Sequence, residues 1–545
     1  MDAPFVQEAP RPRNAYTQDW LLRSYLRRKL PADVLMASEP QLRELAELAA
    51  GPLWDAQLAD RLNEPVLTQW DAWGNRIDRV EPTALWREAE RLTVRFGLTA
   101  LPQEKPYGAW SRTIQFALVH LFHPVTDLYT CPLAMTDGAA RTLLGSGNAA
   151  LIAAAVPRLT SRDPAQFWTS GQWMTESTGG SDVGASETTA QRQSDGTWRL
   201  YGRKWFTSAA TSQMALTLAR PQGNGPGGSG LAMFYLETRD AGGQLNGIRI
   251  ERLKDKLGTR KVPTAELTLD GTVAHLVGAS TQGTRAIEPM LRITRTWNSA
   301  CAASFMRHGF GLASDYAQKR RAFGRPLADQ PLHIDTLAQV DAESAAAFVL
   351  SFYLIELLGL DETAVLDADR AALLRILLPV VKATTGKQVA AVASEVVEAF
   401  GGAGYVEDTG VPVLLRDSQV LPIWEGTTNV LALDLLLRSD LESGLKALRG
   451  VLTAACTAAN DHPLRRAADT ARTALEHAWR WRLATQDRDA LQAGARRFTL
   501  TLGRALGLAL LVEHAANVLD SADRAAAHAA CVRFRQSPVD LIADE

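Results

Sequence analysis

The most informative stretch of this chain is Trp173-Met174-Thr175-Glu176-Ser177-Thr178-Gly179-Gly180-Ser181-Asp182, which follows a short strand-like run. It combines hydroxyl groups, a carboxylate and two adjacent glycines. Glycine lets the backbone approach a ligand closely and adopt positive φ, while hydroxyl and amide groups supply hydrogen bonds. The stretch therefore predicts a loop that contacts a large polar ligand, through a phosphate or the edge of a ring. A surface hairpin turn has a similar composition, so the rest of the chain decides between the two interpretations.

The length and composition indicate a globular protein of several domains. At 545 residues the chain is too long for one compact core, and roughly three or four domains are expected. Hydrophobic residues make up 46%, charged residues 22%, and the formal net charge is -2, so no global charge attracts the chain to nucleic acid or to an anionic membrane. Residues 1–13 lack the basic start and apolar core of a secretory signal, which favours a cytoplasmic protein.

Metal sites, disulfides and membrane spans are not expected. The four cysteines, Cys131, Cys301, Cys456 and Cys531, lie far apart and form no CxxC pair. The nine histidines form no HExxH pair, so we predict reduced core thiols and no metal ion. No uninterrupted apolar stretch reaches the roughly 18 to 20 residues that a bilayer span needs, so we expect no membrane span.

The spacing of apolar residues divides the chain into four parts. A three- and four-residue spacing in 42–62 and 84–96 predicts helices, and short alternating runs between 172 and 283 predict strands. The helical spacing returns in four successive segments between 287 and 437, which is typical of a bundle. We predict an N-terminal helical domain (1–171), a middle β domain (172–284), a helical bundle domain (285–440) and an additional C-terminal helical domain (441–545).

Two further segments favour a bound cofactor. In 202–208, Trp205 offers an aromatic plane and Thr207 a hydroxyl two residues later. On a regular strand both share one face, where a planar cofactor can stack and accept a hydrogen bond; an ordinary core tryptophan is the alternative. At the end of a long helix, Arg320 and Arg321 stand beside Phe323, and arginine forks suit phosphate oxygens. The helix dipole alone would account for one of these arginines.

The last two segments are Gly401-Gly402-Ala403-Gly404-Tyr405 and Leu421-Pro422-Ile423-Trp424-Glu425-Gly426-Thr427-Thr428-Asn429. The glycine cluster follows a predicted helix, and taken alone it is best explained as a helix C-cap with a flexible exit. Glu425 stands between Trp424 and a glycine, after apolar residues. Burial there would raise the pKa of Glu425 and make it a usable general base, whereas an isolated glutamate is usually solvated.

Taken together and in this order, these five segments resemble the acyl-CoA dehydrogenase family of flavoproteins over about residues 90–440. The extra C-terminal part, together with 251–258 and 424–426, is similar to the AidB-like branch, which is linked to the adaptive response to DNA alkylation. The resemblance implies an α+β multidomain fold, with an N-terminal helical domain, a middle β-barrel domain and a C-terminal four-helix bundle, plus an extra C-terminal helical domain.

The resemblance also implies FAD as cofactor, an acyl-CoA as substrate and a homotetramer. Matching positions that would line the FAD and the thioester end of the substrate are Met174, Thr175 and Ser181, with Trp205 and Thr207 flanking the flavin. Across a subunit interface, the pyrophosphate and adenosine would be held by Arg320, Phe323, Gly401, Gly402 and Gly404, and the dinucleotide would be contacted from the other side by Thr427 and Asn429. Glu425 matches the catalytic base, and Arg295 matches an arginine that supports it.

The implied reaction removes the α-proton of the acyl thioester with Glu425, while a hydride leaves the β-carbon for the flavin. Some family members carry the base one residue before Arg295, where this chain has Thr294. Trp173 replaces a usually small residue, and Trp424 is a bulky neighbour of the base. Glu398 and Ala322 also depart from the residues common in the family. These departures predict either a short or branched acyl-CoA or a weakly active, vestigial site. No motif identifies the electron acceptor.

A different function is suggested by the C-terminal part. Between 465 and 504 arginines outnumber acidic residues, and the candidates for contacting phosphate are Arg480, Arg482, Arg488, Arg496 and Arg497. Arginine can neutralise backbone phosphates without reading sequence, which predicts a flavoprotein that binds double-stranded DNA non-specifically. Arginine-bearing solvated helix faces are also common. A third possibility is an oligomerisation module that buries 498–512.

Overall fold

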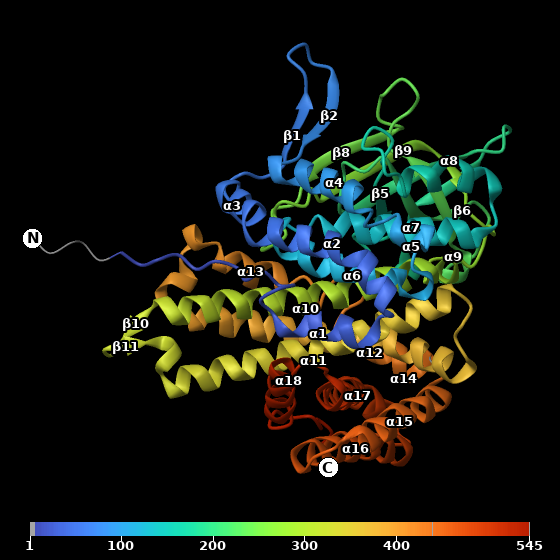
Figure 1. The fold of residues 1–545 in the computed structure, drawn as a ribbon. Coiled ribbons are helices and arrows are strands. Elements are labelled where there is room, and N and C mark those ends of the chain that lie inside the picture. Colours follow the sequence, from blue (N-terminus) through green and yellow to red (C-terminus); the bar gives the residue numbers. More distant parts are fainter. Residues whose placement is uncertain (1–5, 439, 544–545) are drawn as a thin grey trace, which may run out of the picture. The chain divides into compact units, whose positions relative to one another are not determined.

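The computed structural model describes residues 6–438 and 440–543. Its contacts divide the chain into two compact units, which are described separately. The mixed unit comprises Ala59–Glu104 and Thr126–Trp297. The helical unit comprises the chain up to Leu58, Lys105–Val125 and the chain from Asn298 onward. Figure 1 shows the elements of both units in sequence colours.

The mixed unit is built on a closed β-barrel. Its strands are β3 (Ser170–Trp173), β4 (Thr189–Arg192), β5 (Trp198–Thr207), β6 (Met214–Pro221), β7 (Ala232–Glu237), β8 (Ile248–Leu253) and β9 (Ala265–Leu276). Strand β6 pairs with both β4 and β7, so the path β6-β4-β5-β9-β7 returns to β6, and β3 and β8 attach to β6 and β9. Closure leaves no free edge along this path. The predicted middle β-barrel is confirmed.

The helices of the mixed unit are α4 (Ala84–Phe96), α5 (Leu101–Glu104), α7 (Thr130–Ser146), α8 (Ala149–Leu159) and the short α9 (Gly283–Ala286), followed by the first part of α10 (Glu288–Lys319). Helix α4 begins at Thr83, whose side chain accepts a hydrogen bond from the Trp86 amide, and ends at Gly97, which has φ 64°. These are the start and stop signals expected of an amphipathic helix.

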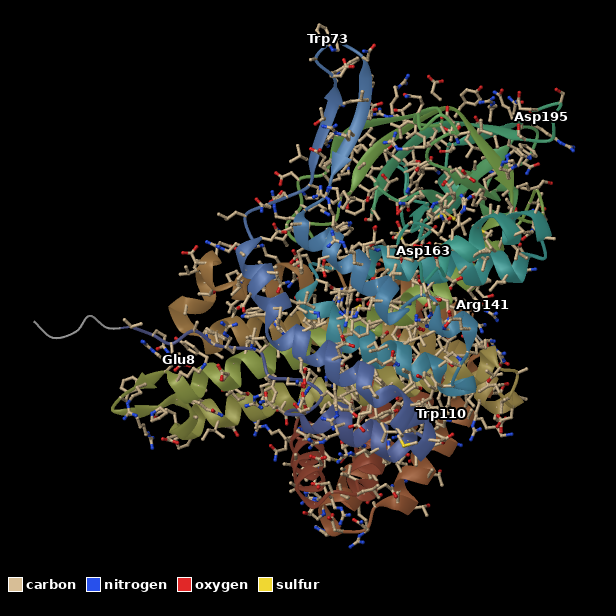
Figure 2. The ribbon with its side chains drawn as sticks, turned by 45° about the horizontal axis from the view of Figure 1, so that its top comes forward. Glu8, Trp73, Trp110, Arg141, Asp163 and Asp195 are labelled. Carbon is tan, nitrogen blue, oxygen red and sulfur yellow. The ribbon has the colours of Figure 1, made fainter. Side chains whose placement is uncertain are left out.

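A β-hairpin interrupts the helices of the N-terminal part, which the sequence pattern predicted to be mostly helical. It consists of β1 (Val66–Trp70) and β2 (Arg76–Glu81), with Trp73 at its exposed tip (Figure 2). The Asp71 side chain accepts hydrogen bonds from the Trp73 and Asn75 amides and closes the turn. Gln69 and Arg76 donate hydrogen bonds to the Ile250 carbonyl of β8. The prediction missed the hairpin because these partners lie about 175 residues away along the chain.

The helical unit contains α1 (Trp20–Lys29), α2 (Ala32–Ala50), α3 (Pro52–Ala59), α6 (Ser111–Phe122), the rest of α10, α11 (Pro331–Glu362), α12 (Ala368–Ala399), α13 (Val411–Ser418) and α14 (Thr428–Arg438). The additional C-terminal helices are α15 (Leu441–Ala458), α16 (His462–Ala484), α17 (Arg488–Asn517) and α18 (Ser521–Phe534). Helix α17 packs against α11, α12 and the other three C-terminal helices. The predicted helical bundle with additional C-terminal helices is confirmed, while the residue boundaries of the four domains stay predictions.

Among the residues that the structure describes, two helices, α11 and α17, are long and apolar enough to cross a membrane. In their most apolar windows, 78% and 83% of the residues are buried by other parts of the protein. Their apolar surface is therefore already covered by protein, as in the core helices of a globular unit.

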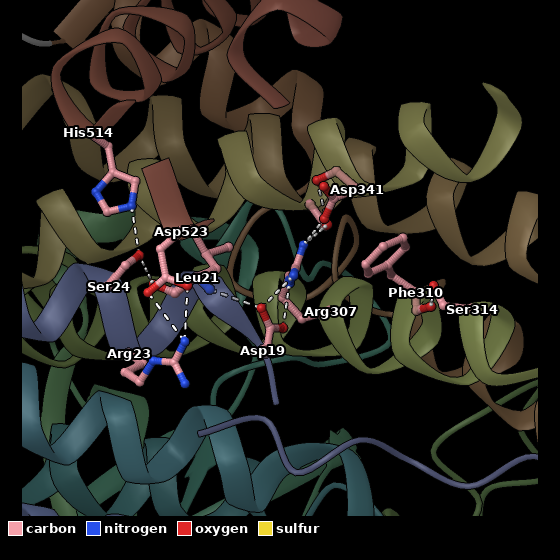
Figure 3. A network of polar contacts seen from close by, with 11 residues as sticks. Asp19, Leu21, Arg23, Ser24, Arg307, Phe310, Ser314, Asp341, His514 and Asp523 are labelled. Carbon is pink, nitrogen blue, oxygen red and sulfur yellow. Dashed lines mark hydrogen bonds and ion pairs between the residues drawn. The ribbon is translucent and has the colours of Figure 1, made fainter. Parts of the chain in front are cut away.

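A buried polar network ties helix α1 to the rest of the helical unit (Figure 3). Arg307 donates to both carboxylate oxygens of Asp19, at 2.6 and 2.9 Å, and also pairs with Asp341 on α11. Despite the opposing effect of burial, Arg307 lowers the pKa of Asp19. On the other side of α1, Arg23 pairs with Asp523 on α18. The N-terminal helix and the C-terminal helices therefore belong to one packed unit.

Three histidines, His120, His123 and His308, are buried in the helical unit. Burial lowers the pKa of His120 to about 4, that of His123 to about 3 and that of His308 to about 4. His120 and His308 line a cavity of about 40 Å³, which has room for ordered water but not for an acyl chain or a nucleotide. All three side chains are therefore neutral in the folded protein near pH 7.

Acidification is expected to destabilise the protein through these histidines. Between their lowered folded pKa and the ordinary value of 6.5, the unfolded chain binds protons that the folded chain does not, so stability falls as pH falls. At pH 5 the loss is about 2 kcal/mol for each histidine. Thermal unfolding followed by circular dichroism should show a lower midpoint at pH 5 than at pH 7.

The substitution His308→Leu should reduce this pH dependence without abolishing it, because His120, His123 and the buried His514, whose pKa is also lowered by burial, remain. The matched control is His275→Gln, since His275 is exposed on β9 and should leave the pH dependence intact. An unchanged midpoint between pH 7 and pH 5 in the unmodified protein would contradict the prediction.

Candidate functional site

The predicted site residues are divided between the two units. The mixed unit carries Met174, Thr175, Ser181, Trp205, Thr207 and Arg295. The helical unit carries Arg320, Phe323, Gly401, Gly402, Gly404, Glu425, Thr427 and Asn429. Each group is described within its own unit.

The loop 174–181 leaves the end of β3 and is bound to β5. The Thr175 carbonyl accepts a hydrogen bond from the Trp205 amide at 2.9 Å, and Glu176 and Gly179 exchange two backbone hydrogen bonds. A Cβ atom on Gly179 would lie 2.6 Å from the Asp182 carbonyl oxygen, so only glycine fits this tight turn. Met174 is buried, Thr175 is half-buried, and Ser181 is exposed.

The carboxylate of this loop points inward. Glu176 Oε1 lies 2.7 Å from Lys204 Nζ, and both side chains are buried. Glu176 also accepts hydrogen bonds from the Thr188 hydroxyl at 2.6 Å and from the Glu187 amide at 2.7 Å, while Lys204 also donates to the Leu218 carbonyl. Burial by itself would raise the pKa of Glu176, but the Lys204 charge and the hydrogen bonds outweigh it and lower that pKa. Glu176 therefore anchors the loop to the barrel.

Trp205 and Thr207 do not share one face, so that prediction is wrong. The pairing of β5 with β9 shifts between Lys204 and Thr207, and Trp205 and Phe206 both turn outward at this bulge. Trp205 is 37% exposed, with Lys254 Nζ 3.4 Å from its ring centroid, whereas Thr207 is fully buried. The Thr207 hydroxyl donates to the Ala265 carbonyl at 2.6 Å. A bulge of this kind cannot be read from the sequence because it depends on the partner strand.

Trp173 also differs from expectation. It is 1% exposed and belongs to the core cluster inside the barrel, together with Phe234 and small residues such as Ala190 and Ala215. Those alanines leave room for a large indole, because a barrel core is filled by matching large and small side chains. The prediction that Trp173 alters the substrate site therefore has no support from its position.

In the helical unit, Glu425 lies in a turn between α13 and α14. Its backbone has φ 59° and that of Gly426 has φ 99°. A left-handed conformation is uncommon for a glutamate and costs about 1–3 kcal/mol, a strain that accumulates at functional sites. Glu425 is half-buried, and Thr427 caps α14 by accepting a hydrogen bond from the Val430 amide. The strained backbone is independent structural support for a functional Glu425; the raised pKa stays a prediction.

The arginine-rich segment after α10 forms a short hairpin. Strands β10 (Arg321–Ala322) and β11 (Arg325–Pro326) are joined by Phe323 and Gly324, with φ 51° and 83°. Phe323 is 98% exposed at the tip. Arg320 precedes the hairpin and is half-buried. The Phe323 ring is therefore almost fully uncovered.

The glycine cluster forms a 3-10 turn directly after α12. Gly401 has φ 59°, which favours glycine, and a Cβ on Gly404 would lie 2.0 Å from the Val397 carbonyl. Gly402 has neither constraint, and nothing lies within 4 Å of the position its Cβ would take. The space beside Gly402 is thus open to a ligand, and Asn429 is likewise exposed.

The candidate nucleic-acid residues cluster where α16 ends and α17 begins. Arg480, Arg488 and Arg496 are exposed, and Arg482 and Arg497 are half-buried. Within the described part of the chain none of them forms an ion pair, whereas Arg472 pairs with Asp469 and Glu476, and Arg504 pairs with Glu343. Trp481 is partly covered by Phe498 and by Gly494, so it is mainly a packing residue.

In residues 6–438 and 440–543, no group of three or more histidine, cysteine, aspartate or glutamate side chains could hold a metal ion. The four cysteines are free thiols, and Cys131, Cys301 and Cys531 are buried.

Models of known protein families match most of residues 7–439. The N-terminal domain of the adaptive response protein AidB matches residues 7–164. The middle domain of acyl-CoA dehydrogenases matches 171–272, and their C-terminal domain matches 281–439.

Two curated relatives cover most of the chain. Acyl-CoA dehydrogenase family member 11 of Caenorhabditis elegans is 39% identical over 98% of this chain and 90% of its own length. The AidB protein of Escherichia coli (strain K12) is 32% identical over 70% of this chain and 71% of its own length.

Two solved structures share the fold over nearly the whole chain. Caenorhabditis elegans ACDH-11 in complex with C11-CoA has a TM-score of 0.93 and 38% identity, covering 97% of this chain and 93% of the other. The apo-form of Bd2924 has a TM-score of 0.87 and 42% identity, covering 94% of this chain and all of the other. The match with ACDH-11 includes the additional C-terminal helices.

Proposed function

The chain belongs to the acyl-CoA dehydrogenase family of oxidoreductases, with an AidB-type N-terminal domain, and from this we propose that it dehydrogenates an acyl-CoA with bound FAD as the oxidant. One observation carries the proposal: Glu425, at the position that matches the catalytic base, is held at φ 59° in a turn between two helices. Residues held in this conformation are concentrated at functional sites, which supports a role for Glu425.

The residues that would hold FAD fit such a group. The Trp205 ring stands out from the bulge in β5 and remains 37% exposed, although Lys254 covers part of it. Beside Gly402 there is open space at a backbone turn, and Phe323 offers an unpacked ring. Backbone amides and glycine suit a pyrophosphate, and aromatic rings suit planar groups. When bound, FAD supplies an acceptor for the hydride.

Residues of the chain would remove the α-proton, align the substrate and exclude water. A carboxylate at Glu425 would take the α-proton of the thioester, provided that it is ionised and lies within hydrogen-bonding reach. The loop 174–181, anchored through Glu176 and Lys204, would exclude water and present hydroxyl groups to the ligand. A rigid anchor helps because the reaction requires close alignment of the reacting atoms.

The acyl chain is proposed to be of medium length. The expectation of a short or branched chain relied on Trp173 and Trp424, and Trp173 lies inside the barrel core. Trp424 remains as a bulky, half-buried neighbour of Glu425. The similar protein ACDH-11 was solved in complex with C11-CoA. A site in this chain that accepts a chain of similar length is the simplest proposal at 38% identity.

The purified protein should therefore carry flavin, and acyl-CoAs should bleach its absorption under anaerobic conditions. A panel of straight chains from C4 to C16 and branched chains of four or five carbons gives the substrate class. The fastest bleaching is expected for medium straight chains. A protein without flavin, or a flavin that no acyl-CoA reduces, would refute the proposed activity.

A homotetramer is proposed as the assembly. Phe323 is 98% exposed and the Gly401–Gly402 turn is open, so both are suited to complete a cofactor site with a neighbouring subunit. Light scattering coupled to size-exclusion chromatography measures the assembly directly.

A second proposed function is non-specific binding of double-stranded DNA by the arginine cluster at α16 and α17, supported by the lack of acidic partners for these arginines in the described chain. Free guanidinium groups at one helix junction can each neutralise a phosphate. The formal net charge of -2 opposes long-range attraction, so binding would depend on this local cluster.

Gel-shift titration of duplex DNA at several salt concentrations tests this function. The double variant Arg480→Ala/Arg496→Ala should weaken binding and reduce the salt slope by about 1 for each phosphate that is no longer neutralised. Arg472→Ala is the matched control, because Arg472 is already paired with Asp469 and Glu476 and should leave the slope unchanged. Equal slopes for all three proteins would exclude the arginine cluster as the DNA site.

A further inference from the structure

The turn that carries Glu425 lies on one face of α12. Lys382 and Gly386 are four residues apart on this helix and therefore project from the same face. Gly386 packs against the start of the turn, and Lys382 donates a hydrogen bond to its end. Both residues lie about 40 residues before the turn in the sequence.

The start of the turn rests directly on the helix backbone. A Cβ atom on Gly386 would lie 3.2 Å from both the Leu421 carbonyl oxygen and Pro422 Cα, so the absence of a side chain allows this close approach. The same Leu421 carbonyl accepts a hydrogen bond from Asn298 Nδ2 at 3.2 Å. Leu421 itself is fully buried. The chain thus enters the turn from a fixed point.

The end of the turn is held by a buried charge. Lys382 is 0% exposed, and its Nζ donates a hydrogen bond to the Gly426 carbonyl at 2.5 Å. An ammonium group is costly to bury unless it is hydrogen-bonded, and its bond to a carbonyl is stronger than one between neutral groups. The carbonyl that it holds belongs to the residue directly after Glu425.

We propose that Lys382 is a positioning residue for Glu425, an inference that rests on the proposed dehydrogenase function. The backbone at Glu425 and Gly426 has φ 59° and 99°. Glycine has many alternative conformations, and a glutamate favours negative φ, so this turn needs an external contact to keep its shape. Lys382 supplies that contact from a helix. Without it the turn relaxes, and the Glu425 carboxylate leaves the position from which it removes the α-proton.

The test is Lys382→Met in the full-length flavoprotein, since methionine retains the apolar length of the side chain but cannot donate to the Gly426 carbonyl. The rate of flavin reduction is expected to fall by about 10- to 100-fold, the effect of moving a catalytic group by about 1 Å. Acyl-CoA affinity and flavin content should change by less than about threefold, because binding contacts are retained.

A spectroscopic readout separates positioning from general stability. A 3-thia-acyl-CoA can lose its α-proton to the base without being oxidised, and the resulting anion gives a charge-transfer band with the flavin. This band should weaken in Lys382→Met, where the base is displaced, and more strongly in Glu425→Gln, where it is absent. The control is Lys387→Met on the same helix, because Lys387 makes no hydrogen bond to the turn within the described residues and its variant should retain both the band and the rate.

Gly386→Ala provides a second variant if Lys382→Met does not fold. The added methyl group pushes against Leu421 and Pro422 while Lys382 is unchanged, and it should also lower the rate and the band. The inference is overturned if the folded variants keep the rate and band of Lys387→Met. If acyl-CoA reduces the unmodified protein and only Glu425→Gln loses this activity, the proposed function is supported and the positioning role of Lys382 is refuted. If no acyl-CoA reduces the unmodified protein, both the proposed function and the role of Lys382 are refuted.

Discussion

Glu425→Gln is expected to lower the rate of flavin reduction by acyl-CoA about 100- to 10,000-fold, the contribution of a well-placed general base. Glutamine has nearly the same shape and can adopt the same turn, but an amide cannot take the α-proton. No second base should replace it at the position before Arg295, because Thr294 carries no carboxylate. Anaerobic stopped-flow mixing with the best substrate of the panel measures the rate.

The matched control is Glu442→Gln on α15, an exposed carboxylate outside both groups of site residues, and its rate should be unchanged. Acyl-CoA affinity, measured by calorimetry, should be nearly the same in all three proteins, because the loss lies in the chemical step. If Glu425→Gln retains more than about a tenth of the wild-type rate, the base lies elsewhere.

Lys204→Met is expected to destabilise the mixed unit by about 3–5 kcal/mol, because it leaves the Glu176 carboxylate buried without its cation. Since Glu176 anchors the loop 174–181, the variant should also lose bound flavin. Guanidinium unfolding followed by circular dichroism gives the stability, and the ratio of flavin to protein absorption gives the occupancy.

The double variant Lys204→Met/Glu176→Gln should recover part of the stability, since no uncompensated charge remains buried. The control is Arg249→Met, which removes the exposed Arg249–Asp270 pair of the same barrel and should cost less than about 1 kcal/mol. Equal losses in Lys204→Met and Arg249→Met would contradict the anchoring role.

The two sources of pH dependence act in different ranges. The pKa of Glu176 is lowered in the folded protein, so its contribution is lost only as pH falls below its ordinary value of 4.5 towards the lowered one. The buried histidines reduce the stability of the folded protein as pH falls from 6.5 to about 4. Destabilisation at pH 5 should therefore persist in the double variant.

The fold was predictable because its signals are local. Apolar spacing identified the helices and the β part in the correct order, and the five motifs in their order identified the family. The β1–β2 hairpin was missed because its five- and six-residue strands are held by long-range contacts with Ile250 of β8. Short strands in a helical region carry too little periodicity to be recognised.

The site was predictable in its residue types and only partly in its geometry. Glycines such as Gly401 and Gly404 have a local backbone or packing reason that a sequence pattern can suggest. The directions of side chains in the barrel depend on how the strands pair. The bulge between Lys204 and Thr207 places Trp205 and Thr207 on different faces, although their spacing predicted a shared face. The role of Lys382 could not be predicted from the sequence because the Gly426 carbonyl that it binds lies on another segment.

The sequence by itself determined the family, the order of helical and β parts and the identity of Glu425 as candidate base, since motifs and spacing are properties of the chain. The directions of the side chains in residues 173–182 depend on the tertiary structure. Glu176 faces inward and pairs with Lys204, and Trp173 fills the barrel core. The reason is that a buried charge or indole is placed by partners that satisfy it, and these come from other strands.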